Sequence, residues 1–398
     1  MPSQQWRGPI ETIPSTSLPL KIAQIAPLIE SVPPRLYGGT ERVVSYLTEE
    51  LVAQGHDVTL FASGRSMTSA KLIPCCDLPL RQKGAPDPLP HYLAMLDKAH
   101  GMAAQFDILH FHIDQLQFPL FRDLASRTLT TLHGRQDLPD LEEFYTRFPQ
   151  MPLVSISDAQ RRPVPHANFI GTVPNGLPLD LFAPTLDPRG GYLAFLGRVS
   201  PEKGLDHAIA IASAVGLPLR IAAKIDRPDA EYFHNVIEPL LAPPMIDYVG
   251  EIDDRQKSRF LGEARALLFP IEWPEPFGVV MIEAMACGTP VLAFRRGSVP
   301  EVVDEDVTGC LVDTVSEAIA ALGRVLALDR ARVRRRFETR FSAARMARNY
   351  VALYRRLLGA SGARPRAEQP ILLASDRFPN RLEDGLERRL THPARLSM

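Results

Sequence analysis

The chain has 398 residues, of which 45 % are apolar and 23 % charged, and its formal net charge is −1. This composition suits a globular protein of two domains, and the balanced charge gives no overall attraction to nucleic acid or to an anionic membrane. No apolar run approaches the roughly 20 residues that span a bilayer, and the N-terminus lacks the apolar block of a signal peptide. We therefore expect a cytoplasmic protein whose four cysteines are reduced.

Strand and helix patterns alternate from residue 21 onward, after a polar N-terminus, residues 1–18, that we predict to be disordered. A strand, a glycine-containing loop, a helix and a second strand form a βαβ unit, and such units build parallel sheets that bind ligands at the carboxyl ends of their strands. Residues 19–176 are therefore predicted to form one Rossmann-like domain. The predicted strands cover 21–27, 56–63, 106–112, 128–134, 152–157 and 167–176, and the helix covers 41–55.

A second alternation begins after residues 177–190, a segment containing proline and glycine that we interpret as a linker. Residues 191–341 are predicted to form another doubly wound domain, so the fold class is α/β with two Rossmann-like domains facing a cleft. A helix over 342–359 is expected to cross back to the first domain, and residues 360–398 are expected to be irregular. The predicted strands cover 191–199, 219–226, 246–252, 265–271 and 289–295, and helices cover 205–216, 230–241, 254–264 and most of 316–358.

Two glutamates, Glu275 and Glu283, lie on either side of a predicted loop-to-helix junction near Phe277. Prolines before Phe277 disfavour helix upstream, and Gly288 ends the helical pattern. The free amides at the start of this helix suit a phosphate, so the two acids could bracket a phosphorylated, hydroxyl-rich ligand, with Glu283 about two turns inside the helix. In the alternative interpretation Glu275 caps the helix and Glu283 is solvated, and the spacing alone does not decide between them.

Two cations, Arg198 and Lys203, lie in a turn that follows the first strand of the second domain. They could be surface charges, but a guanidinium and an ammonium on a short turn at a strand's carboxyl end could also hold a diphosphate. The segment from Glu275 to Glu283 is expected at the same edge of the same parallel sheet, which favours the second interpretation.

With these motifs the chain resembles glycosyltransferase family 4, the retaining group 1 enzymes of the GT-B fold. The resemblance covers roughly residues 20 to 358. Four motifs occur in the family's order, namely YGGTERVV, VPNGLPLDLF, GRVSPEKG and EPFGVVMIEAMACGTPV. The resemblance implies transfer of a hexose from a nucleotide-diphosphate sugar, by default a UDP-sugar and next GDP-mannose, to an acceptor hydroxyl with retention at the anomeric carbon.

The resemblance also implies roles for individual residues. In the catalytic set, Arg198 and Lys203 bind the departing diphosphate, Glu275 lies near the transferred sugar, and His133 contacts the sugar. Glu283 accepts hydrogen bonds from the ribose. The rest of the donor-binding set comprises Gly38 and Gly39, which let a loop approach the phosphates, and the backbone amides of Phe277, Gly278 and Val279. No cofactor or metal is expected besides the nucleotide sugar as co-substrate.

Other polar residues near these motifs have more than one interpretation. His110 and His112 share a face of one strand and suggest a metal pair, but no third ligand is evident. Alternatively His112 or Asp114 faces the acceptor. The motif that contains Ser157 and Asp158 is expected to cap a helix, with a further contact to the acceptor as an option. Lys224 is either a third phosphate-facing cation or a strand cap.

Several alternatives to a simple transferase remain. A retaining enzyme could use double displacement, but the motifs offer no nucleophile in the first domain, so front-face substitution with the diphosphate taking the acceptor's proton fits better. A sugar phosphorylase or a sucrose- or trehalose-type synthase would use the same scaffold, and so would a catalytically silent nucleotide-sugar-binding protein. A nicotinamide dehydrogenase is disfavoured because no G-x-G-x-x-G follows a strand. The partner is a sugar, lipid or small-molecule acceptor, and residues 71–98 show no basic amphipathic helix to support membrane association.

Overall fold

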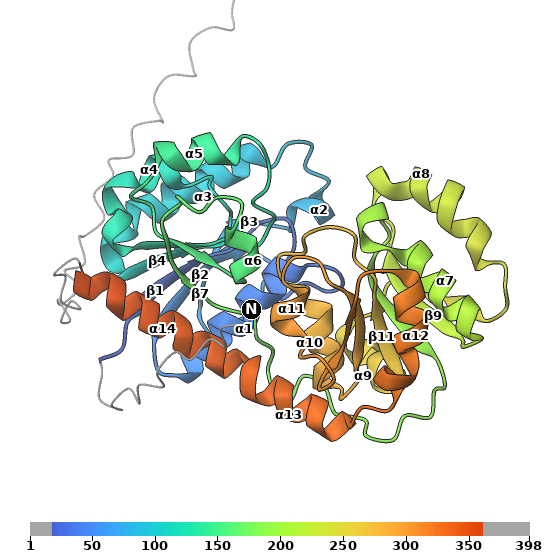
Figure 1. The fold of residues 1–398 in the computed structure, drawn as a ribbon. Coiled ribbons are helices and arrows are strands. Elements are labelled where there is room, and N and C mark those ends of the chain that lie inside the picture. The colour runs from blue at the N-terminus through green and yellow to red at the C-terminus, as the bar shows by residue number, and fades with distance from the viewer. Residues whose placement is uncertain (1–17, 361–398) are drawn as a thin grey trace, which may run out of the picture. The chain divides into compact units, whose positions relative to one another are not determined.

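A computed structural model describes residues 18–360 of the chain (Figure 1). The predicted disorder of the N-terminus and the irregular tail fall outside the described residues, except that helix α14, Ala343–Ala360, extends to the position where the tail was expected to begin. Two parallel sheets form the framework, and helices cover both faces of each sheet (Figure 1). Among residues 18–360 no helix combines the length and the apolar character needed to cross a membrane.

The first sheet has seven parallel strands in the order β3-β2-β1-β4-β5-β6-β7. Six of them were predicted, and the edge strand β3 was not, because it contains Pro74 and buries only one of its six side chains. The strands are β1 Lys21–Ile25, β2 Asp57–Ser63, β3 Lys71–Cys76, β4 Ile108–Phe111, β5 Thr128–Thr131, β6 Leu153–Ser155 and β7 Phe169–Thr172. The helices are α1 Gly39–Ala53, α2 Leu80–Lys83, α3 Leu89–Gly101, α4 Phe118–Phe121, α5 Leu141–Arg147 and α6 Asp158–Arg161.

The second sheet has six parallel strands in the order β10-β9-β8-β11-β12-β13. In both sheets the strand order reverses beside the first strand of the domain, which is the switch point where doubly wound folds bind ligands. The strands are β8 Leu193–Arg198, β9 Leu219–Lys224, β10 Ile246–Tyr248, β11 Ala266–Phe269, β12 Val291–Phe294 and β13 Gly309–Val312. The helices are α7 Leu205–Val215, α8 Ala230–Tyr232, α9 Asp254–Gly262, α10 Val279–Ala286, α11 Val299–Val302, α12 Val315–Leu326 and α13 Arg330–Arg340.

Two local predictions need correction. The helix expected near Phe277 begins at Val279, because Gly278 takes a left-handed φ of 76° and the chain turns there. The helix expected over residues 230–241 is only α8 over its first three residues, and it continues as one turn of π-helix and one of 3-10 helix. Strand β13 was also missed, since a four-residue apolar run cannot be distinguished from a helix segment by its periodicity.

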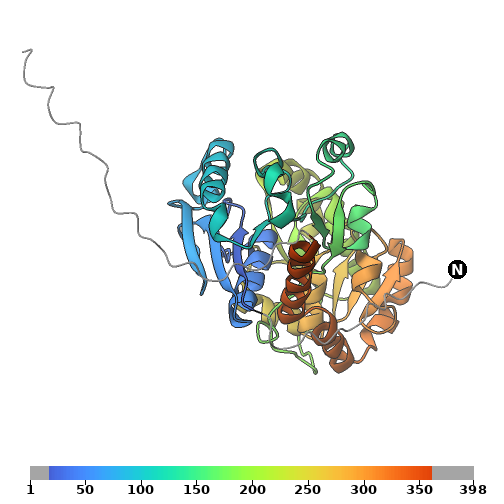
Figure 2. The ribbon, with the colours of Figure 1, turned by 90° about the vertical axis from the view of Figure 1, so that its left-hand side faces the viewer.

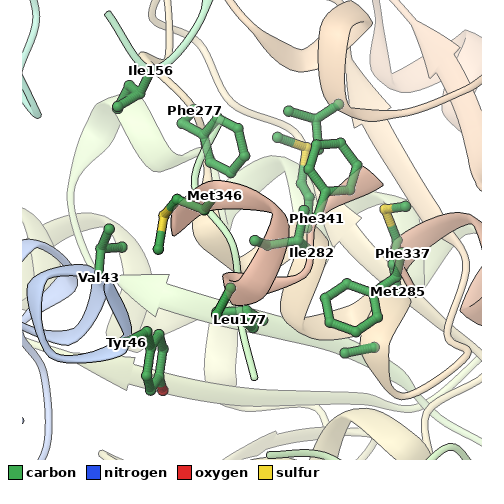
Figure 3. Close-up of a cluster of buried hydrophobic side chains, with 14 of the residues drawn as sticks. Val43, Tyr46, Ile156, Leu177, Phe277, Ile282, Met285, Phe337, Phe341 and Met346 are labelled. Carbon is green, nitrogen blue, oxygen red and sulfur yellow. The ribbon is translucent and has the colours of Figure 1, made fainter. Parts of the chain in front are cut away.

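The chain passes between the two sheets at two neighbouring points. Leu177 and Ser342 form a parallel bridge, with Leu177 N donating to Phe341 O at 2.9 Å and Ala343 N donating to Leu177 O at 2.8 Å. After the second crossing, α14 packs beside α1 (Figure 2). A continuous buried cluster joins these elements, with side chains from α1, α10, α13 and α14 in contact around the crossing (Figure 3). The C-terminal helix is therefore part of the first domain's packing.

Candidate active site

A pocket of about 460 Å³ lies at the carboxyl ends of the strands of both sheets. Every residue that the sequence analysis assigned to catalysis or donor binding lines it, although the first domain and the second contribute from separate parts of the chain. These residues are Gly38, Gly39, His133, Arg198, Lys203, Glu275, Phe277, Gly278, Val279 and Glu283. Their shared location follows from the fold, whereas their individual roles stay predictions.

Glu275 is held in the pocket by two donors. Lys203 Nζ lies 2.6 Å from Glu275 Oε2, and Trp273 Nε1 donates to the same oxygen at 2.8 Å. Glu275 is only 8 % exposed, and α10 has no side-chain cap at its N-terminus. The interpretation of Glu275 as a helix cap is therefore wrong. Its carboxylate is fixed by charge-assisted hydrogen bonds and lies beside the turn that carries Lys203.

Glu283 is buried, which excludes the interpretation of a solvated side chain. It is 4 % exposed, and Lys257 Nζ donates to its Oε1 at 2.8 Å. It is the fifth residue of α10, so it lies one turn inside the helix and not two. Lys257 also lies 3.5 Å from Asp254, which in turn pairs with Arg42 of α1. This chain of ion pairs links the predicted ribose-binding acid to the first domain.

Three cations, Arg198, Lys203 and Lys224, line the pocket at the carboxyl edge of the second sheet. Arg198 and Lys224 end the neighbouring strands β8 and β9 and are partners in the strand register. Arg198 pairs with Glu202 at 2.6 Å, and Lys224 pairs with Asp226 at 2.8 Å. Lys224 lines the pocket, as one of its two interpretations requires. A diphosphate placed here would share these cations with the carboxylates that already neutralise them.

Gly204 fixes the position of the turn that carries Lys203. Its φ is 67°, and a Cβ atom at this residue would lie 2.0 Å from the carbonyl oxygen of Pro270. Only glycine allows the turn to approach the end of β11 this closely. The Arg198 to Lys203 turn and the segment before α10 are thereby kept next to each other.

His110 and His112 are buried behind the pocket wall, and His133 is partly buried at the wall itself. His133 follows β5 and lines the pocket, and its Nε2 lies 2.9 Å from His112 Nδ1. His112 is 3 % exposed and does not line the pocket, and the exposed Asp114 does not line it either. The expectation that one of them faces an acceptor in this pocket is therefore not supported.

The metal interpretation of His110 and His112 is also not supported, because all four of their ring nitrogens make hydrogen bonds to side chains. His110 bonds to Tyr354 and Thr131, each at 2.7 Å. His112 bonds to His133 and, at 2.7 Å, to Gln24. Among residues 18–360, the His, Cys, Asp or Glu groups close enough to share an ion comprise only Glu305, Asp306 and Cys310, which lie outside the pocket.

Burial of these histidines predicts a loss of stability in acid. Burial lowers the pKa of His133 from 6.5 to about 4. Below pH 6.5 the unfolded chain therefore binds more protons than the folded protein, and stability falls as the pH drops toward 4. Between pH 7 and 5 this effect costs about 2 kcal/mol for His133 alone. Urea unfolding of the wild type at both pH values measures the total change.

Two variants separate the contribution of His133 from that of other groups. His133→Gln should reduce the difference in unfolding free energy between pH 7 and 5 by about 2 kcal/mol. His166→Gln, at an exposed position, should leave that difference unchanged. If the His133 variant kept the wild-type pH dependence, the neutral state of His133 in the folded protein would be contradicted.

Ser157 caps a helix, as predicted. Its Oγ accepts from Gln160 N at 3.0 Å at the start of α6 and donates to Pro276 O, in the other domain, at 2.7 Å. The Asp158 carboxylate accepts from Thr172 Oγ1 at 2.7 Å. Neither residue lines the pocket, so the optional acceptor contact is not supported.

Sequence reasoning missed several residues on the pocket wall. From the first domain these are Glu30, Tyr37, Glu41, Arg42 and Arg81, and from the second they are Lys257 and Trp273. The sequence could have placed Glu41 and Arg42 on the pocket wall, because they directly follow the glycine loop. It could also have placed Lys257 there, because Lys257 lies in the first turns of a helix that starts at the carboxyl edge of the sheet. No sequence pattern indicated that Arg81 lines the pocket, because its position depends on the unpredicted helix α2.

The architecture and the pocket define a class of protein. Two doubly wound parallel sheets with a cation-rich pocket at their carboxyl edges form a GT-B fold. A solved structure of AviGT4, a glycosyltransferase involved in avilamycin A biosynthesis, superposes with a TM-score of 0.66 at 25 % identity, covering 86 % of this chain and 98 % of that one.

Sequence comparisons identify the family. A family model described as Glycosyl transferases group 1 matches residues 180–340, and one described as Glycosyltransferase Family 4 matches residues 37–170. An alpha-maltose-1-phosphate synthase of Mycolicibacterium smegmatis is 33 % identical over 194 residues, 43 % of this chain and 49 % of the relative. A D-inositol 3-phosphate glycosyltransferase of Segniliparus rotundus is 30 % identical over 222 residues, 49 % of each chain. The chain belongs to glycosyltransferase family 4 of group 1, and its aligned part spans about half the length of these curated relatives.

Proposed function

We propose that this chain transfers a hexose from a nucleotide-diphosphate sugar, by default a UDP-sugar, to an acceptor hydroxyl. The observation that carries the proposal is the grouping of Arg198, Lys203 and Lys224 beside the N-terminus of α10, with two buried glutamates in the same pocket. Cations and free helix amides suit a diphosphate, and buried carboxylates suit the hydroxyl groups of a ribose and a sugar.

Each part of the pocket then has a distinct task. Arg198, Lys203 and the amides at the start of α10 stabilise the negative charge that develops on the departing diphosphate. Glu283 accepts hydrogen bonds from the ribose, and Glu275, positioned by Lys203, accepts them from the transferred sugar. Transfer from at least one nucleotide sugar to a panel of hydroxyl acceptors tests this assignment. Failure to transfer or hydrolyse any of them would favour a silent binding protein.

Retention at the anomeric carbon is part of the proposal, and two carboxylates of the first domain make its mechanism testable. Glu30 pairs with Arg81 at 2.5 Å, and Glu41 is 6 % exposed in the first turn of α1. Both line the pocket. Burial raises the pKa of Glu41, which disfavours the ionised form that a nucleophile needs. We therefore assign neither as a nucleophile and retain front-face substitution, in which the leaving diphosphate accepts the acceptor's proton.

Glu41→Gln should keep turnover within about tenfold of the wild type, because an amide of the same shape preserves the pocket while removing a nucleophile. Glu49→Gln, on the same helix but outside the pocket, serves as the matched control. Steady-state rates with the best donor measure the effect. A fall of several orders of magnitude in the Glu41 variant alone would indicate double displacement through a glycosyl-enzyme intermediate.

The alternative for the acceptor is inorganic phosphate or a sugar phosphate in place of an unphosphorylated sugar. The names of the two curated relatives refer to a maltose phosphate and an inositol phosphate. Arg81 gives the first-domain side of the pocket a cation that could meet such a phosphate. A phosphorylase or a sucrose- or trehalose-type synthase therefore stays the second candidate. Inorganic phosphate and sugar phosphates, offered as acceptors beside unphosphorylated sugars, distinguish it from the simple transferase.

A further inference from the structure

A chain of buried hydrogen bonds runs from the C-terminal helix to His133. On α14, Tyr350 OH lies 2.9 Å from Thr131 Oγ1, and Tyr354 OH lies 2.7 Å from His110 Nδ1. Gln24 of β1 connects Tyr354 to His112, which contacts His133. All members except His133 are buried, so water does not complete their hydrogen bonds. Which atom donates and which accepts in each of these hydrogen bonds is therefore set by the neighbouring side chains.

The amide of Gln24 determines the hydrogen position on His112. Its nitrogen donates to Tyr354 OH at 3.2 Å, and its oxygen lies 2.7 Å from His112 Nε2. A carbonyl oxygen only accepts, so His112 carries its hydrogen on Nε2. A neutral imidazole has one N–H, which leaves Nδ1 of His112 as an acceptor.

The same logic extends to the pocket. His112 Nδ1 lies 2.9 Å from His133 Nε2, so His133 must donate from Nε2. Burial lowers the pKa of both rings, which keeps them neutral. Within residues 18–360, His133 Nδ1 makes no hydrogen bond of its own, and His133 lines the pocket. The ring nitrogen of His133 that remains available to a substrate, Nδ1, therefore carries a lone pair and can accept a hydrogen bond.

We propose that Gln24 and His112 are positioning residues that hold His133 in the Nε2–H tautomer, so that its Nδ1 accepts a hydrogen bond from a substrate hydroxyl. The relevance to catalysis rests on the function proposed above, but the tautomer does not. Tyr354 supports the arrangement by accepting from the Gln24 amide. The crossing of α14 back to the first domain thus contributes to the active site through hydrogen bonds as well as through packing.

The tautomer can be observed directly by NMR of the full chain with ¹⁵N-labelled histidine. The chain has ten histidines, and the spectrum of His133→Asn assigns the signals of His133 by their absence. The wild type should show His133 protonated on Nε2 with a bare Nδ1. In the reverse arrangement the Gln24 amide is turned over and His133 carries its hydrogen on Nδ1. Observation of that tautomer in the wild-type spectrum would overturn the proposal.

Gln24→Met tests the positioning role. It removes the acceptor that His112 Nε2–H has among residues 18–360, so His112 gains by moving its hydrogen to Nδ1, and His133 shifts toward the Nδ1–H tautomer. Turnover should fall about three- to tenfold, in line with one neutral hydrogen bond. Tyr350→Phe is the matched control, because it removes a buried hydroxyl at the other end of the same network without contacting Gln24.

The two readouts separate the proposal from a merely structural role. Gln24→Met should change both the His133 spectrum and kcat, whereas Tyr350→Phe should change neither. An unaltered His133 tautomer in Gln24→Met, or an equal loss of kcat in both variants, would overturn the positioning role. If the protein transfers no sugar at all, the spectrum still reports the tautomer, so failure of the proposed function is distinguishable from failure of this inference.

Discussion

Arg198→Ala should lower turnover about 10²- to 10³-fold while leaving the protein folded. Arg198 ends β8 in the pocket, and its partner Glu202 is partly exposed, so water can solvate that carboxylate when the guanidinium is removed. The stability cost is therefore small. The loss falls on the chemical step, because a fixed cation at the departing diphosphate acts most strongly when negative charge develops.

Arg220→Ala is the matched control for this experiment. Arg220 lies on the neighbouring strand β9 and also pairs with a carboxylate, Asp247, at 2.9 Å, but it does not line the pocket. Its variant should keep wild-type turnover. Near-normal turnover in Arg198→Ala would contradict the role of Arg198 in binding the diphosphate. Equal losses of turnover in both variants would indicate damage to the sheet.

Lys203→Ala should give a similar loss of turnover with a different effect on stability. It leaves the buried Glu275 carboxylate with Trp273 as its one remaining side-chain donor in the described part of the chain, and an unpaired buried charge is costly. The double variant Lys203→Met with Glu275→Gln removes both charges and should recover stability without recovering turnover. Comparing the unfolding free energies of both variants therefore separates the folding cost of Lys203 from its catalytic contribution.

Glu283→Ala should weaken donor binding about tenfold to a hundredfold, the range expected for lost hydrogen bonds between a carboxylate and ribose hydroxyls. Within the described residues the variant also leaves the mostly buried Lys257 with Asp254, at 3.5 Å, as its one acidic partner, so the free energy of unfolding should fall. Calorimetric titration with a nucleoside diphosphate measures the affinity, and urea unfolding measures the stability.

Lys257→Met separates the two effects of Glu283. It removes the cation but keeps the carboxylate, so donor affinity should stay closer to that of the wild type than in Glu283→Ala. Combining Glu283→Leu with Lys257→Met should recover stability while affinity stays low. If Glu283→Ala bound the nucleoside diphosphate as tightly as the wild type, Glu283 would have no part in donor recognition.

The motif residues could be predicted because their positions follow from short-range patterns. Arg198 and Glu275 each lie close to the carboxyl end of a strand with a clear apolar run, and parallel sheets bring such ends to one edge. The spacing of Glu275 and Glu283 in the sequence did not show whether their side chains are buried or which cations they contact. The burial of Glu283 depends on Lys257, which comes from a different helix.

The histidine network could not be predicted for a related reason. Gln24 and Tyr354 are 330 residues apart, and only the return of α14 to the first sheet brings them into hydrogen-bond distance. Alternation along the predicted strand 106–112 correctly placed His110 and His112 on one face, although β4 itself ends at Phe111. A shared face is equally compatible with a metal pair and with a hydrogen-bond chain. The partners of the ring nitrogens decide between these interpretations, and they lie on other elements.

Recognition of a nucleotide diphosphate in the pocket is the central claim, and thermal unfolding with a panel of nucleoside diphosphates and their sugars tests it most directly. A true donor or its nucleotide at 100 times its dissociation constant should stabilise the wild type by about 2.7 kcal/mol. At the same concentration Arg198→Ala should gain less, and Arg220→Ala should gain as much as the wild type. No stabilisation of the wild type by any nucleotide would contradict the account.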